Sequence, residues 1–260
     1  MSERERYGLG YGEATHAWMR QRAAESHAGF FAPHLKSGMR LLDCGCGPGS
    51  ISVGLARLVA PGDLVGVDLS PQQVARAQTL AAETEAANAA FGVGDAYALP
   101  FDDASFDAVF AHATLFHLRE PAKALAEFRR LLRPDGVLGV RDPDYADWAL
   151  TPATDDLSVA QSLLLRLSRH EGASPTYAGH LAELLASAGF TNIEVATRTA
   201  ANRPSGAYAQ RLIAMRDTVL GQDWADAAAL DRLIGSLRAW SQHAGAGEHL
   251  AWREAVARPG

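Results

Sequence analysis

The 260-residue sequence predicts an α/β protein built on a doubly wound, mostly parallel sheet. Three observations predict this class. Short apolar runs recur along residues 39–142, amphipathic segments of helical period lie between them, and turn-forming groups such as Pro61-Gly62 and Arg133-Pro134-Asp135-Gly136 separate the two. Strands that alternate with helices form parallel sheets with right-handed crossover connections.

Seven segments are expected to be strands, because each is short and mainly apolar. They are Met39–Asp43, Leu64–Leu69, Phe91–Gly94, Phe106–Ala111, Val137–Asp142, Asn192–Thr199 and Glu248–Val256. The last segment is ambiguous with a helix, since it is rich in Ala, Glu and Arg. The sheet is therefore expected to have seven strands.

The expected helices have apolar residues at three- and four-residue spacing or clear end signals. They are Ile51–Val59, Ser70–Ala87, Pro121–Leu132, Tyr177–Ala188, Ser205–Leu220 and Ala225–His243. Ser70 suits an N-cap and Pro71 suits the first helical position. Gly189 is expected to close the helix before it as a C-cap.

We expect residues 1–260 to form one domain with three kinds of segment. Residues 1–38 are a helical extension, residues 39–142 are the ligand-binding core, and residues 143–175 and 200–245 are helical lid segments. Neither an internal repeat nor a low-complexity linker interrupts them.

Composition excludes several classes of function. The formal net charge is -6, from 24 basic and 30 acidic residues, which argues against a nucleic-acid-binding surface. No apolar run approaches the ~20 residues that span a bilayer, and the charged N-terminus lacks the apolar stretch of a signal peptide. We therefore expect a cytoplasmic protein without a membrane span.

Acidic residues follow three of the expected strands, at Asp43, Asp68 and Asp95. The carboxyl ends of neighbouring parallel strands meet at one edge of the sheet, where ligands bind. A glycine-rich turn, Gly45 to Gly49, follows the first strand and lets a ligand approach the backbone and the free N–H groups of the next helix. These residues predict a ligand site at that edge.

Two cofactor classes use such an arrangement. A dinucleotide needs Gly-x-Gly-x-x-Gly, but Ser50 stands at the third glycine position and Asp43 would place a negative charge beside a pyrophosphate. Asp43 instead suits an ammonium group, Asp68 a ribose diol and Asp95 an adenine amino group. These three groups without a phosphate describe S-adenosylmethionine (SAM), and an NAD(P)-dependent reductase is the more distant alternative.

Five ordered segments resemble class I SAM-dependent methyltransferases, in the methyltransferase type 11 or ubiquinone-biosynthesis C-methyltransferase-like group. They are Leu41–Gly49, Gly66–Ser70, Gly94–Phe101, Ser105–Phe110 and Arg129–Gly136. The resemblance covers about residues 39–142. It implies a Rossmann-like fold whose last strand is antiparallel to its neighbour, which favours a strand for Glu248–Val256.

The resemblance also implies cofactor-binding roles. Asp43 and the loop residues would hold the methionine portion, Asp68 the ribose hydroxyls, and Asp95 with the Ala96 amide the adenine, against which Leu69 packs. Backbone near Ala111 and His112 would line the methionine end. The full predicted set is Asp43, Gly45, Cys46, Gly47, Gly49, Asp68, Leu69, Asp95, Ala96, Ala111 and His112.

Other residues invite functional and structural interpretations. His117 and His112 follow the fourth strand and are candidates for a general base, with packing as the alternative for both. Cys44 and Cys46 have no second Cys pair to form a zinc site, so we predict small buried residues there. Arg141-Asp142-Pro143-Asp144-Tyr145 offers two carboxylates, which are too few to predict a metal.

The N-terminal extension contains Tyr7, Tyr11, Trp18 and Arg22. An aromatic face beside a sulfonium gains cation–π energy, and Arg22 is placed to meet the carboxylate of SAM. The alternative is simple packing of an amphipathic helix.

Taken together, these features predict a SAM-dependent methyltransferase that acts on a small-molecule acceptor in secondary or cofactor metabolism. The acceptor atom stays open among O, N and C, and a homodimer is one expectation for its assembly. The alternatives are a non-methylating enzyme on the same fold and a SAM-binding module without catalysis.

Overall fold

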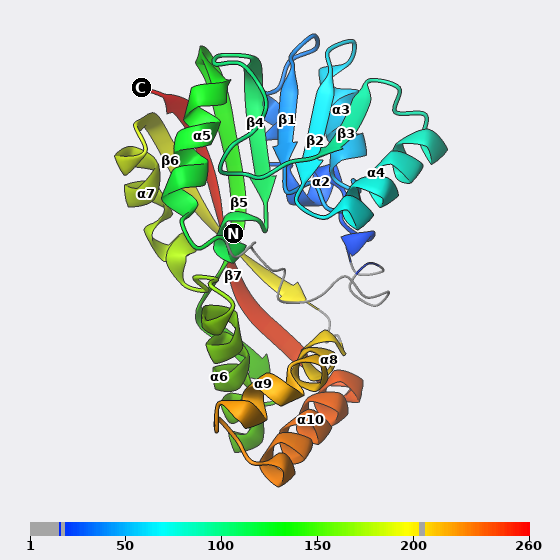
Figure 1. The fold of residues 1–260 in the computed structure, drawn as a ribbon, viewed down its shortest axis with the longest axis vertical. Helices are drawn as coiled ribbons and strands as arrows, with labels where there is room; N and C mark the ends of the chain where they lie inside the picture. The colour runs from blue at the N-terminus through cyan, green and yellow to red at the C-terminus, as the bar shows by residue number, and fades with distance from the viewer. Residues whose placement is uncertain (1–15, 17–18, 203–205) are drawn as a thin grey trace.

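A computed structural model describes residue 16, residues 19–202 and residues 206–260. These residues contain a seven-stranded sheet with the strand order β3-β2-β1-β4-β5-β7-β6 and helices on both faces (Figure 1). The strands are β1 Leu41–Cys44, β2 Leu64–Asp68, β3 Ala89–Val93, β4 Phe106–His112, β5 Leu132–Thr151, β6 Phe190–Asn202 and β7 Gly247–Pro259. The predicted α/β class and its mostly parallel, seven-stranded sheet are confirmed.

Strands β1 to β5 pair in parallel, and only β7 runs against its neighbours. It is antiparallel to both β5 and β6. The ambiguous segment Glu248–Val256 is therefore a strand, as the family resemblance implied. Its charged residues left the segment ambiguous with a helix. In the strand these residues face partners on the neighbouring strands, and Glu254, for example, forms an ion pair with Arg141 of β5.

Five of the six predicted helices lie inside their predicted ranges, and the sixth, Ser205–Leu220, is divided. The helices of the described residues are α2 Ala24–His27, α3 Ser52–Val59, α4 Pro71–Glu83, α5 Pro121–Leu131, α6 Asp155–His170, α7 Leu181–Ser187, α8 Ala207–Ala214, α9 Arg216–Gly221 and α10 Ala227–Gln242, with short 3-10 turns η1 Ala32–His34, η2 Leu115–His117 and η3 Tyr177–His180. Ser70 caps α4 by accepting the N–H of Gln73, as predicted. Within the described ranges, no helix combines the length and hydropathy needed to cross a bilayer.

Two apolar clusters cover opposite faces of the sheet. Helices α2 and α3 contribute Ala24, Leu55 and Val59 to one of them, together with Phe31. Helices α5 and α7 contribute Phe128 and Leu185 among others to the second. Both clusters include residues of β1 and β4, so these central strands are buried on both sides. This packing fixes the position of their carboxyl ends.

Strand β5 is longer than predicted. The sequence suggested a helical segment from residue 143, but residues 143–151 continue the strand and pair with β7. Pro143 is tolerated because β4 ends at the pair His112–Arg141, so that beyond this point β5 has no partner on that side. The predicted lid segment 143–175 is therefore wrong over its first nine residues, and the helix occupies Asp155–His170.

Long strands β5, β6 and β7 carry a second helical layer beyond the sheet, formed by α6, α8, α9 and α10 (Figure 1). We refer to these four as the distal helices. They share an apolar cluster of their own that includes Leu163, Leu212, Leu233 and Trp240. The predicted helix Ser205–Leu220 is divided there into α8 and α9. The carboxyl ends of the parallel strands face the same direction as this layer.

Candidate functional site

The carboxyl ends of β1, β2 and β4 border one pocket. All the predicted cofactor residues except Gly49 and Ala111 line it. They are Asp43, Gly45, Cys46, Gly47, Asp68, Leu69, Asp95, Ala96 and His112. The topology thus brings together residues that are up to 69 positions apart in the sequence.

Gly49 and Ala111 lie outside this pocket. Gly49 has a φ of +80°, and a Cβ there would stand 3.0 Å from the Cβ of Ala77. Its small size therefore lets α4 approach the loop. Ala111 is fully buried in the core beneath the pocket. The structure gives both residues packing roles, which the motif by itself did not distinguish from ligand contact.

Gly45 shapes the turn after β1. Its φ of +77° lies in the left-handed region, and a Cβ would come within 2.2 Å of the hydroxyl oxygen of Thr114. The N–H groups of Gly45 and Cys46 both donate to the carbonyl of Val67. Any side chain at Gly45 would push the turn away from β4 and narrow the pocket.

Asp43 is a buried carboxyl group at the end of β1. Only 2% of it is exposed, and Ser52 donates a hydrogen bond of 2.6 Å to its Oδ2. Burial and the nearby Asp68 raise the pKa of Asp43 from 3.8 to about 7, against the lowering effect of Ser52. A cation in the pocket would relieve this burial cost, so the site favours a ligand with an ammonium group.

Asp68 has both carboxylate oxygens anchored by backbone. Oδ1 accepts the N–H of Ser70 and Oδ2 accepts the N–H of Gly47, each at 2.9 Å. Burial raises its pKa, while these two hydrogen bonds lower it. Each oxygen has a second lone pair, so a fixed carboxylate that can accept from two neighbouring hydroxyl groups faces the pocket.

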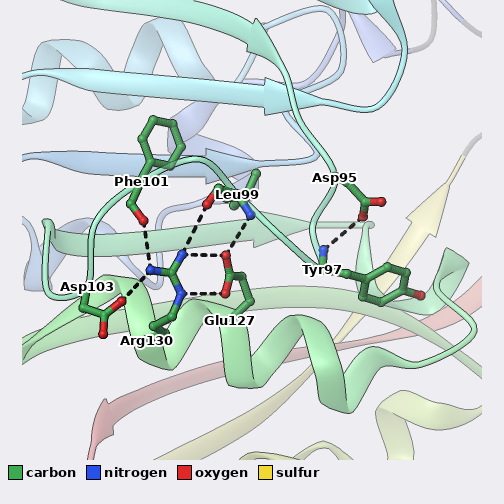
Figure 2. Close-up of polar contacts among 7 residues, drawn as sticks. All are labelled: Asp95, Tyr97, Leu99, Phe101, Asp103, Glu127 and Arg130. Atoms are coloured by element: carbon green, nitrogen blue, oxygen red, sulfur yellow. Dashed lines mark hydrogen bonds and ion pairs between the residues drawn. The ribbon is translucent and has the colours of Figure 1, made fainter.

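Asp95 begins the turn that follows β3. Its Oδ1 accepts the N–H of Tyr97 at 3.0 Å (Figure 2). Ala96, which follows it, also lines the pocket. The side chain is thus held at the rim of the pocket.

Arg130 and Glu127 of α5 hold the loop that follows Asp95. The guanidinium donates to the carbonyls of Leu99 and Phe101 and to the carboxylates of Asp103 and Glu127, while Glu127 accepts the N–H of Leu99 (Figure 2). Sequence reasoning missed this support. The signal was present, because an acid and a base stand three residues apart on a helix after an Asp-rich turn.

Gln73 of α4 is a pocket residue that the sequence did not reveal. It is 1% exposed, and neither polar atom of its amide has a hydrogen-bond partner among the described residues. Buried amides are rarely left in this state. Because Gln73 lines the pocket beside Asp68 and Leu69, its amide is available to a bound ligand.

His112 ends β4, and its ring is held by Arg141. Nε2 lies 2.8 Å from Nη1 of Arg141, and the ring stacks on Trp252 with 5.3 Å between centroids. Burial lowers its pKa well below the ordinary value, and the charges of Arg22 and Arg141 lower it further. His112 is therefore neutral, and Nε2 is occupied.

His117 also lines the pocket, next to Leu118. Burial lowers its pKa to about 3, with contributions from the charges of Arg211 and Arg22. As an imidazole with so low a pKa is a weak proton acceptor, neither predicted base is strongly basic in this structure. Arg22, for which the sequence left contact with SAM and helix packing open, borders the same pocket, whereas Tyr7, Tyr11 and Trp18 lie outside the described residues.

The carboxylates considered for a metal have structural partners. Oδ2 of Asp142 accepts the hydroxyl of Tyr177 at 2.6 Å and the N–H of Leu115, which ties down the turn that carries His117. Asp144 forms an ion pair with Arg253 at 2.9 Å. Nowhere in the described ranges do three or more metal-ligating side chains gather.

A glycine turn and three acidic strand ends around one pocket define an α/β protein of the SAM-binding class. A family model described as a methyltransferase domain matches residues 35–199, which is more than half of the chain. The chain therefore belongs to this methyltransferase family.

Individual relatives agree with this membership. The chain is 32% identical over 168 residues to an uncharacterized methyltransferase of Schizosaccharomyces pombe, covering 62% of this chain and 59% of that protein. It is 32% identical over 171 residues to nocamycin O-methyltransferase of Saccharothrix syringae, covering 61% of each. The chain thus spans less than two thirds of each relative.

Solved structures show the same fold. The YcgJ protein of Bacillus subtilis aligns over 89% of this chain and 97% of its own, with a TM-score of 0.63 and 16% identity. Together with the family match, this confirms the resemblance to class I methyltransferases. Solved structures of the same fold in complex with SAM and S-adenosylhomocysteine support SAM as the cofactor of the family.

Proposed function

We propose that this protein transfers a methyl group from SAM to a small-molecule acceptor. One observation carries the proposal: three carboxylates, Asp43, Asp68 and Asp95, stand at consecutive strand ends around one pocket, each in a different environment. A buried carboxyl of raised pKa suits an ammonium, an anchored carboxylate suits a diol, and a rim carboxylate suits an amine.

The residues present fit SAM better than a dinucleotide. Asp43 would repel a pyrophosphate at the glycine turn. The amide of Gln73, which has no hydrogen-bond partner among the residues that the structure describes, lines the same pocket, where a ribose or base edge could satisfy it. SAM supplies an electrophilic methyl group when it is bound. The chain's own task is then to bind, to align and to exclude water, and alignment alone contributes ~7–11 kcal/mol.

The two pocket histidines support a reaction that relies on alignment more than on proton removal. Arg141 occupies Nε2 of His112, and the pKa of His117 is about 3. A general base is needed only when the acceptor must lose a proton as it attacks. We therefore favour an acceptor whose lone pair is already available near neutral pH.

The distal helices are proposed to act as the lid over the acceptor. Arg211 of α8 is close enough to His117 to lower the pKa of that ring. A run of aromatic contacts also leads from the pocket side toward α8. The centroids of Phe116 and Tyr145 are 6.0 Å apart, those of Tyr145 and Trp148 5.3 Å, and those of Trp148 and Tyr208 5.2 Å. These rings favour an acceptor that is at least partly apolar.

Calorimetry with SAM and with NAD tests the cofactor. We expect SAM to bind and NAD not to bind, and Asp68→Ala to weaken SAM binding by ~1–3 kcal/mol through the loss of hydrogen bonds to a charged group. Binding of NAD alone would overturn the proposal in favour of a reductase.

Release of S-adenosylhomocysteine in the presence of candidate acceptors tests the transfer. Stoichiometric release with a methylated product supports a methyltransferase. SAM binding with a converted but unmethylated substrate indicates a non-methylating enzyme, and SAM binding with no conversion in a broad acceptor screen indicates a binding module.

A further inference from the structure

The ring of His112 is in contact with an arginine from the neighbouring strand. His112 and Arg141 are paired in the register of β4 and β5, and Nη1 of Arg141 lies 2.8 Å from Nε2 of His112. Arg141 is held in turn by Glu254 of β7, at 3.1 Å from Nε, and lies 4.3 Å above the ring of Trp252. Three strands therefore fix the position of this guanidinium.

This contact determines where the proton of His112 resides. A guanidinium has five N–H donors and no acceptor, so Nε2 must accept the hydrogen bond. The proton of the neutral ring is then on Nδ1. The charged and titratable groups that face the ring are Arg141 from β5, His27 from α2 at 5.2 Å between centroids, and Arg22. All of them oppose a second proton on the ring.

The Nδ1 atom of His112 is buried and has no hydrogen-bond partner on any other residue of the described ranges. A buried donor is normally satisfied, and His112 is one of the residues that line the ligand pocket. The missing acceptor is therefore expected on the ligand.

The neighbouring side chains indicate which group of the ligand supplies it. Asp43 lies near the end of the adjacent strand β1 and favours an ammonium, while Arg22 borders the pocket and adds a positive charge. In an α-amino acid the ammonium and the carboxylate are attached to the same carbon. A carboxylate beside the ammonium would meet both positive and hydrogen-bond-donating side chains.

We propose that Arg141, a residue of β5 that is not part of the pocket lining, is a positioning residue that holds His112 as a neutral Nδ1–H donor to the carboxylate of the cofactor. This inference rests on the proposed function, since it assigns one end of the SAM site. His112 then acts as a fixed donor, and Arg141 acts only through it.

The first test needs neither a ligand nor a variant of Arg141. Long-range proton–nitrogen correlation spectra of the ligand-free protein report which ring nitrogen of each histidine carries a proton, and His112→Asn assigns the signal. We expect a single Nδ1–H tautomer that does not titrate between about pH 5 and 8. An Nε2–H tautomer, or a ring that gains a second proton in this range, would overturn the proposal.

The second test compares the affinities for SAM and for decarboxylated SAM, which retains the ammonium but lacks the carboxylate. The wild-type protein should prefer SAM. Arg141→Met should reduce this preference about tenfold, because the ring is no longer held as a donor to a charged group. Arg141→Lys keeps a cation that only donates and should retain most of the preference.

Glu254→Gln is the matched control, because it removes the negative charge while the amide oxygen of glutamine can still accept the Nε–H of Arg141, so that the contact with His112 is kept. It should keep the preference for SAM. If Arg141→Met retains the preference, or Glu254→Gln loses it equally, the inference is wrong. Failure of the wild-type protein to bind either compound would instead overturn the proposed function.

Discussion

Burial is the main cause that raises the pKa of Asp43 and of Asp68 in the pocket. Asp43 has a pKa of about 7 because it is desolvated and close to Asp68, and the hydrogen bond from the hydroxyl of Ser52 opposes this shift. At the scale of single residues, burial of ionised Asp43 is unfavourable by itself, and a cation in the pocket would offset this unfavourable free energy.

The affinity for SAM is expected to rise with pH up to about 7 and then to level off. The ammonium of SAM favours ionised Asp43, and this carboxyl carries a proton below its pKa of about 7. The slope should approach tenfold per pH unit well below that value. Titration calorimetry between about pH 5.5 and 8.5 measures it, and Asp43→Asn should bind more weakly and without the slope.

The raised pKa of Asp43 has the opposite effect on the stability of the protein without SAM, which falls as pH rises. Because the folded state holds this proton more tightly than the unfolded state, burial of Asp43 lowers the free energy of unfolding as pH rises from about 4 to 7. Asp142, whose pKa burial also raises to about 7, contributes in the same direction. If the affinity of Asp43→Asn for SAM still rose with pH as steeply as that of the wild-type protein, the pH dependence of binding would not come from Asp43.

Gln73→Met should change stability and binding in opposite directions. The buried amide has no partner among the described residues, so an apolar side chain of similar size should raise the stability of the ligand-free protein by about 1 kcal/mol. SAM binding should weaken by a similar amount. Thermal unfolding and calorimetry measure the two effects, with exposed Gln72→Met as control. A variant that is less stable and binds normally would show that Gln73 has a packing role only.

At the scale of elements, helix α5 supports the rim of the pocket from a distance. It places Glu127 and Arg130 under the loop from Leu99 to Asp103, and their hydrogen bonds reach both backbone and side chains of that loop (Figure 2). The position of Asp95 and Ala96 therefore depends on a helix that does not touch the ligand pocket.

Arg130→Met should weaken SAM binding by about 1 kcal/mol and lower the unfolding temperature by a few degrees, because several charge-assisted hydrogen bonds to the loop are lost together. Calorimetry and thermal unfolding measure both. Arg133→Met is the control, since it removes a surface pair with Asp107 that contributes little. Equal effects of the two substitutions would contradict a specific role for Arg130 in the loop.

Element boundaries followed from the sequence where one strong local signal existed. Ser70 and Pro71 marked the start of α4, and Gly189, with a φ of +84°, follows the end of α7. The continuation of β5 through Pro143 was missed, because the local sequence reads as a break. Only the pairing with β7 beyond the end of β4 makes a strand favourable there.

At the scale of the whole molecule, the described part of the chain forms two separate apolar regions joined by long strands. The sheet has clusters on both faces, and the distal helices share a cluster that includes Leu150 at the end of β5 (Figure 1). The cofactor pocket belongs to the first region. Substitutions in the second region should therefore affect the acceptor rather than the cofactor.

Leu233→Ala tests this separation. Leu233 is 2% exposed within the distal cluster, so the substitution should destabilise these helices by ~2–5 kcal/mol. Turnover should fall strongly while SAM affinity stays within about twofold. Arg238→Ala on the exposed side of α10 is the matched control. A parallel loss of SAM affinity would show that the two regions are not independent.

The sequence by itself determined the α/β class, the strand ends that carry Asp43, Asp68 and Asp95, and the choice of SAM over a dinucleotide. These depend on local patterns: apolar period, glycine spacing and the sign of a charge beside the turn. Tertiary structure alone decided the length of β5, the packing roles of Gly49 and Ala111, the place of Gln73 in the pocket lining and the contact of Arg141 with His112. Each of these depends on which distant segments become neighbours, and burial and hydrogen-bond partners are properties of that neighbourhood rather than of the residue.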